Sequence, residues 1–171
     1  MPEDDDVFPD REMSHRDKVV FMLEREGWAL DAVPARADLD PPFPRYAYTI
    51  GLQERFDFPE LCVVGLSPVA CRGLFDLVVD AVAGGTELPI GAAFIGLLDG
   101  SQPCALLPVD PVACASLFPS LTEHHELAGH PANAFAMVQL TWPDGQGVLP
   151  WEPGFAPALV AQQLLFAEPP G

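Results

Sequence analysis

Hydrophobic positions recur with helical spacing in two segments of the chain. The first segment follows Ser14–Asp17, which has the form of a capping box, and its apolar positions continue as far as Gly27. The second follows Ser67–Pro68, a serine N-cap before a proline in the first helical position, and stops at Gly84–Gly85. The pattern therefore predicts two main helices, over about residues 15–26 and from Pro68 to the glycine pair.

Shorter apolar or alternating runs lie between and after these helices and predict β-strands. They cover residues 28–33, 46–52, 61–66, 93–98, 104–109 and 134–142. Short helices are expected over residues 111–118, 121–127 and 157–166. Because short turns such as Asp99–Gly100 join the strands, we expect an α+β fold. It would combine a largely antiparallel mixed sheet with two main helices and a C-terminal Trp-rich segment.

The N-terminus differs in composition from the rest of the chain. Residues 1–13 carry Glu3 and Asp4–Asp6, show no periodicity and are expected to form a flexible acidic arm. Residues 14–171 suit a single globular domain, since 49% of the 171 residues are hydrophobic. The N-terminal acids do not fit a signal peptide, and no apolar run approaches the roughly 20 residues that span a bilayer. We therefore expect a cytoplasmic protein, and the scarcity of Lys beside Arg, Ala, Gly and Pro is typical of GC-rich bacteria.

The charge balance limits the classes of partner. Eight Lys and Arg stand against 25 Asp and Glu, which gives a formal net charge of −17. A field of this sign repels phosphate backbones and anionic membranes, so we expect neither nucleic acid nor a membrane surface as a partner. It would attract a basic protein or peptide, although solubility alone also explains such a charge.

Cysteine and histidine spacing gives no support for a metal site. The cysteines at positions 62, 71, 104 and 114 form no Cys-x-x-Cys pair and lie in apolar surroundings, which is typical of buried free thiols. His125 and His130 are five positions apart rather than the four that place two imidazoles on one helix face. No nucleotide-binding glycine motif is present, and Pro68 after Ser67 removes an N–H that an oxyanion hole would use. We expect no metal and no cofactor.

Polar and aromatic residues gather around the strand predicted over residues 46–52. Alternation places Tyr48 on one face of this strand and Arg45 and Thr49 on the other. A buried polar side chain needs a partner, so Arg45 or Thr49 is expected to contact Glu60. We interpret Arg45, Tyr48 and Thr49 as candidate ligand-binding residues. The alternative is a sheet with Tyr48 in its core and Glu60 at its edge.

Two tryptophans lie close together near the C-terminus, each beside a proline and an acidic residue. Trp142 precedes Pro143–Asp144, and Trp151 precedes Glu152–Pro153. Two indoles of this kind would close a binding pocket or anchor an interface, or would pin a long turn onto the core. If the protein is catalytic, Glu60, Asp144 or Glu152 would act as general base, because desolvation beside an indole raises the pKa of a carboxylate.

Several of these segments, taken together, resemble one family of bacterial domains of unknown function, DUF4262. The resemblance rests on YAYTIGL at residues 46–52, Pro59–Leu61, VGLSP at residues 64–68, QLTWPDG at residues 139–145 and PWEPG at residues 150–154. Two positions depart from the family pattern: Phe58 stands where a His is usual, and Glu152 where an Asp is usual. The resemblance implies no established activity, and whether the loss of the usual His at Phe58 matters stays open.

Two hypotheses from different classes follow. The first is a small-molecule or peptide-binding domain, in its catalytic version a tailoring enzyme, with a pocket between the Tyr48–Glu60 region and the Trp142–Trp151 segment. The second is a non-catalytic interaction module, of an adaptor or immunity type, that binds a basic partner. A flavin-binding barrel is a third interpretation by analogy alone, and the C-terminal tryptophans would also suit a homodimer.

Overall fold

The two main helices begin where the capping serines predict. The computed structural model describes residues 14–131 and 134–170, so the arm expected over residues 1–13 lies outside the described residues. Helix α1 spans His15–Glu26, and the Ser14 hydroxyl accepts a hydrogen bond from the Asp17 N–H at 3.1 Å. Helix α3 spans Pro68–Ala83 behind the matching Ser67 cap. Both predicted helices are confirmed.

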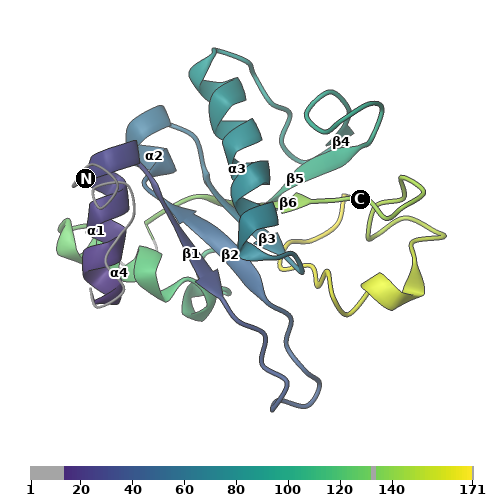
Figure 1. Cartoon of the computed structure of the whole chain (residues 1–171), viewed down its shortest axis with the longest axis horizontal. Helices are drawn as coiled ribbons and strands as arrows, with labels where there is room; N and C mark the ends of the chain where they lie inside the picture. Colours follow the sequence, from purple (N-terminus) through teal and green to yellow (C-terminus); the bar gives the residue numbers. More distant parts are fainter. Residues whose placement is uncertain (1–13, 132–133, 171) are drawn as a thin grey trace, which may run out of the picture.

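The strands form one six-stranded sheet in the order β1-β2-β3-β6-β5-β4 (Figure 1). β3 and β6 run parallel, and every other neighbouring pair is antiparallel. This confirms the expected α+β fold with a mostly antiparallel mixed sheet. The strands are β1 Ala29–Val33, β2 Tyr46–Ile50, β3 Glu60–Val64, β4 Ala93–Phe94, β5 Cys104–Val109 and β6 Met137–Thr141.

Apolar side chains cover both faces of the sheet. One core contains Phe75 and Val78 of α3, packed against Val63 and other inward residues of the central strands. The core on the opposite face contains Val19 of α1 and Leu121 of α4, which spans Pro119–Leu127. Every strand except the two-residue β4 therefore contributes to two cores, as the continuous burial of β2 and β3 shows.

Three predicted elements differ from the structure. The strand expected over residues 46–52 ends at Ile50, because Gly51 has φ = 103° and turns the chain into a short helix, α2, Leu52–Phe56. The strand expected over residues 93–98 is reduced to the two residues of β4. The helix expected over residues 111–118 is reduced to the 3₁₀ turn η2, Ala115–Leu117, whereas the helix expected over residues 121–127 is present as α4, which begins two residues earlier.

The C-terminal segment also departs from its predicted helix over residues 157–166. It contains only the 3₁₀ turn η3, Pro157–Leu159. Beyond η3, the backbone bonds to a buried side chain of β6: the Gln139 amide donates to the Leu164 carbonyl at 2.9 Å and accepts from the Phe166 N–H at 2.7 Å. The Gln139 side chain thus replaces the helical hydrogen bonds of this segment.

No helix among the described residues has both the length and the apolar character that a bilayer span requires.

Candidate functional site

Glu60 begins β3 and holds the start of α2. Its side chain is 1% exposed, and each carboxylate oxygen accepts hydrogen bonds. Oε1 accepts from the Thr49 hydroxyl at 2.8 Å and from the Leu52 N–H at 3.1 Å, whereas Oε2 accepts from the N–H groups of Gly51 and Gln53. Of the two contacts expected for Glu60, the one with Thr49 is therefore formed. Glu60 satisfies the free N–H groups at the first turn of α2.

Burial raises the pKa of Glu60 to about 7, and the hydrogen bonds from Thr49 and from the backbone of α2 oppose this shift. A pKa in this range would suit a general base, as the sequence suggested. The geometry gives the carboxylate a different task, since its oxygens already face four donors of the protein. Glu60 also does not line the cavities described below.

Tyr48 is fully buried and joins the sheet to two helices. Its hydroxyl donates to Asp31 Oδ2 at 2.6 Å and accepts from the Ser120 N–H at 2.9 Å. His15 Nε2 lies 2.7 Å from Ser120 Oγ and 3.4 Å from Asp31 Oδ1. Burial, followed by the charge of Asp31, raises the pKa of Tyr48 far above its ordinary value. The network attaches the first residues of α1 and α4 to one face of the sheet.

The proximity of His15, Ser120 and Asp31 has the residue types of a catalytic triad but not its geometry. A triad needs the carboxylate on Nδ1, so that Nε2 is free to accept the serine proton. Here the single nitrogen Nε2 faces both Ser120 and Asp31. This arrangement fixes the imidazole between its two partners and does not activate the hydroxyl. Sequence reasoning missed this cluster, because its members come from three separate segments.

The two C-terminal tryptophans pack on opposite sides of the sheet. Trp142 packs with the α3 core, and its indole N–H donates to the Val64 carbonyl at 2.9 Å. Trp151 packs against the core on the other face. The structure therefore does not bring Trp142 and Trp151 together around the pocket that the sequence suggested, and each indole pins its own part of the C-terminal segment.

The carboxylates beside these tryptophans shape the loop between them. Asp144 accepts hydrogen bonds from the N–H groups of Gln146, Val148 and Ala156, and Glu152 accepts from the Leu149 N–H at 2.8 Å. The bond with the Val148 backbone contributes most to a lowered pKa of Asp144. The expectation that an adjacent indole raises the pKa is therefore not met at Asp144.

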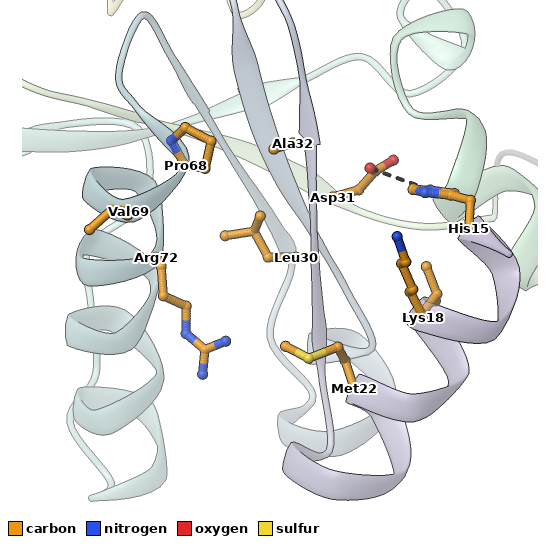
Figure 2. A pocket seen from close by; sticks show the side chains of 10 residues that line it. His15, Lys18, Met22, Leu30, Asp31, Ala32, Pro68, Val69 and Arg72 are labelled. Carbon is orange, nitrogen blue, oxygen red and sulfur yellow. Dashed lines mark ion pairs between the residues drawn. The ribbon is translucent and has the colours of Figure 1, made fainter. Parts of the chain in front are cut away.

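A cavity of about 570 Å³ lies between α1 and α3, with β1 along its floor (Figure 2). A second cavity, of about 440 Å³, shares Ala32 and Pro68 with the first and continues to Arg45. We call the two cavities together the β1 groove. The side chains that line its first part include Lys18 and Met22 from α1, Leu30 and Ala32 from β1, and Val69 and Arg72 from α3.

The walls of the β1 groove are mostly apolar, with charged groups at separate points. Figure 2 shows Leu30 pointing toward α3 and Asp31 toward His15 of α1, as alternation along a strand requires. Val69 is 83% exposed, which is unusual for an aliphatic side chain that borders a cavity. Arg45 is the sequence-predicted ligand-binding residue that lies at the groove, whereas Tyr48 and Thr49 are buried and line neither cavity.

β1 is an edge strand, and within the described residues it pairs with β2 alone. The hydrogen bonds that β2 forms with β3 determine which way the backbone groups of β1 point. The Gly65 N–H donates to the Arg45 carbonyl at 2.8 Å, so Arg45 and every second residue after it direct their backbone groups toward β3. The residues between them, among them Tyr46 and Tyr48, direct theirs toward β1.

The register then fixes which residues of β1 face the open edge. Tyr46 pairs with Val33 and Tyr48 with Asp31, so these β1 residues exchange hydrogen bonds with β2. The N–H and C=O groups of Leu30 and Ala32 point the other way, and both residues line the groove. As far as the described residues show, the groove thus contains an unpaired stretch of sheet edge between two helices.

Three histidines at the end of α4 form a cluster without metal-site geometry. His125 is 3% exposed, and neither of its ring nitrogens has a hydrogen-bond partner among the described residues. Its ring centroid lies 5.9 Å from that of His124 and 6.0 Å from that of His130. Burial, followed by the charge of His124, lowers the pKa of His125. In the part of the chain that is described, no three His, Cys, Asp or Glu side chains are placed to hold a metal ion.

Comparisons with known proteins identify a family but no activity. The model of a domain of unknown function (DUF4262) matches residues 22–156, a span that includes β1 and α3 but begins after His15 and Lys18 of α1. No curated protein and no solved structure matches the chain. Because the matched span covers most of the sequence, including every motif on which the resemblance rested, this chain belongs to the DUF4262 family.

Proposed function

We propose that this protein is a peptide-binding domain that accepts an extended peptide as an additional strand on β1. The observation that carries the proposal is the outward direction of the Leu30 and Ala32 backbone groups within the β1 groove. An unpaired strand edge offers a row of donors and acceptors that a second chain can satisfy. Strand addition of this kind is a recurrent mode of peptide recognition.

The walls of the groove supply the apolar contacts that such a peptide needs. Side chains of an added strand alternate between the two faces of the sheet. Those on one face would meet Met22 of α1, and those on the other would meet Leu30 and the exposed Val69 of α3. Main-chain hydrogen bonds would then provide affinity, and the walls would select side chains.

The contacts of the candidate catalytic carboxylates favour a binding function over catalysis. Glu60, Asp144 and Glu152 each accept hydrogen bonds from backbone N–H groups of their own neighbourhood. Asp31 lines the groove, but its oxygens face Tyr48 and His15. We therefore favour a binding domain over a tailoring enzyme.

A cytoplasmic location in a bacterium forms part of the proposal. Its structural support comes from the cysteines: Cys62, Cys71 and Cys104 are buried and free, and Cys114 is half-buried and free. Free thiols of this kind are typical of reducing compartments.

A selection from a displayed library of random heptapeptides against the full chain tests the proposal. Hydrogen exchange, measured by NMR with and without a selected peptide, then reports the site. We expect the amides of Leu30 and Ala32 to exchange fast in the free protein and slowly in the complex. The amides of Asp31 and Val33 provide the internal control, because β2 already protects them.

The variant Ala32→Pro removes one outward N–H without touching the bonds to β2. Proline is tolerated at an edge strand when its nitrogen faces outward, so we expect this variant to fold and to bind selected peptides at least tenfold more weakly. Ala32→Ser keeps the N–H at similar size and should bind like the unmodified protein. Equal binding by Ala32→Pro and the unmodified protein would show that the peptide does not pair with β1.

A further inference from the structure

Basic side chains are concentrated along the β1 groove. The chain has only eight Lys and Arg against 25 Asp and Glu, yet Lys18, Arg45 and Arg72 line the two connected cavities. Asp31 is the one acidic residue among the described residues that line them. The sign of the groove is therefore opposite to that of the molecule.

Within the described part of the chain, two of these cations are free to bind a ligand. Arg72 forms ion pairs with Glu26 and Asp76, and its guanidinium lies 4.5 Å from the centre of the Trp28 ring. Its charge is therefore largely neutralised by partners within the protein. Lys18 and Arg45 form no ion pair with any described residue.

The carboxylate in the groove, by contrast, already has partners within the protein. Asp31 is 7% exposed, accepts a hydrogen bond from the Tyr48 hydroxyl at 2.6 Å and lies 3.4 Å from the His15 ring nitrogen. Its charge is thus directed toward the core and toward α1. An incoming chain would meet the ammonium of Lys18 in the first cavity and the guanidinium of Arg45 in the second.

We propose that the β1 groove selects extended peptides that carry carboxylate side chains, with Lys18 and Arg45 as their ion-pair partners. The inference rests on the strand addition proposed above and specifies its partner. It differs from the basic partner that the net charge alone suggested. In physiological salt, charges more than about 8 Å away are largely screened, so the cations inside the groove decide the selection at contact.

The experiment compares two double variants of the full chain that change the net charge equally. Lys18→Glu with Arg45→Glu reverses the free cations of the groove. Arg25→Glu with Arg36→Glu reverses two exposed cations that line neither cavity. The probe is the displayed library of random heptapeptides, followed by fluorescence polarisation with one selected peptide.

We expect the unmodified protein to enrich peptides with net negative charge. Reversal of Lys18 and Arg45 should weaken binding of the selected peptide about tenfold or more, and reversal of Arg25 and Arg36 less than about twofold. Enrichment of neutral or basic peptides that still protect the Leu30 amide would overturn this inference and leave the proposed function intact. Equal losses in both double variants would overturn it too, since they indicate general repulsion.

Two further outcomes separate this inference from its alternatives. No enrichment at all, from the unmodified protein and from a variant with Glu3 and Asp4–Asp6 changed to amides, would contradict the proposed function itself. Enrichment only after that change would show that the acidic N-terminal arm of this chain fills the groove, and would overturn the proposal of a separate partner.

Discussion

At the scale of single residues, Glu60 decides the path of the chain between β2 and β3. Its buried carboxylate accepts hydrogen bonds from the Thr49 hydroxyl and from the N–H groups at the start of α2. A charge without a basic partner is costly in such a place, which explains why its pKa rises to about 7. The residue thus makes the stability of the fold depend on pH in an uncommon direction.

The variant Glu60→Gln isolates this effect. Between about pH 4.5 and about pH 7 the folded protein keeps a proton on Glu60 that the unfolded chain has lost, so the free energy of unfolding falls as pH rises. The shift corresponds to about 3 kcal/mol across this range. Urea unfolding at several pH values should show that decline in the unmodified protein relative to the variant.

The variant should also be less stable at the acidic end of the range. An amide nitrogen placed against backbone N–H donors leaves those donors unsatisfied, at a cost of about 1–3 kcal/mol. A stability difference that stays constant or grows with rising pH would contradict the raised pKa, and would mean that the backbone donors keep Glu60 ionised.

At the scale of elements, two buried glutamines hold the C-terminal segment in place of a helix. Gln139 of β6 bonds to Leu164, Phe166 and Ala167, and the Gln163 side chain bonds to both backbone groups of Trp142. Side-chain amides can imitate a backbone partner because they carry one donor group and one acceptor group.

The variant Gln139→Leu should release this segment. The backbone groups of Leu164, Phe166 and Ala167 would lose their partner, so we expect faster hydrogen exchange at Phe166 and Ala167 and a loss of about 2–3 kcal/mol in the free energy of unfolding. The exposed Gln146 provides a control, and Gln146→Leu should change stability by less than about 0.5 kcal/mol. Unchanged exchange in Gln139→Leu would show that apolar packing alone holds the segment.

At this scale, sequence reasoning predicts some elements correctly and fails for others. Local signals were sufficient for α1 and α3, because a capping serine and an apolar stripe lie within one stretch of chain. The contact between Thr49 and Glu60 could be expected from a buried polar pair on adjacent strands. The β1 groove could not, because it combines segments around Lys18, Leu30 and Arg72 that meet only after both helices pack. The predicted helix over residues 157–166 failed because Gln139, far away in sequence, bonds to the same backbone groups.

At the scale of the whole molecule, the net charge and the charge inside the groove have opposite signs. The net charge is −17, yet the groove presents Lys18 and Arg45, which have no ion-pair partner among the described residues, beside a strand edge that no described residue pairs with. At low ionic strength, where screening is weak, long-range repulsion slows the approach of an acidic peptide, and ion pairs inside the groove favour it at contact. We infer that selectivity arises after encounter, mainly in the dissociation rate.

The open edge of β1 has a consequence for colloidal stability. A free strand edge is a template for sheet extension between identical copies, and mutual repulsion of like-charged molecules is one means of preventing it. This protection disappears near the isoelectric point of about 4.2. Light scattering should therefore detect reversible self-association as the pH approaches that value, with less of it in Ala32→Pro than in Ala32→Ser. The surplus of acidic residues would then serve to keep the edge vacant, so that a partner strand meets it before another copy does.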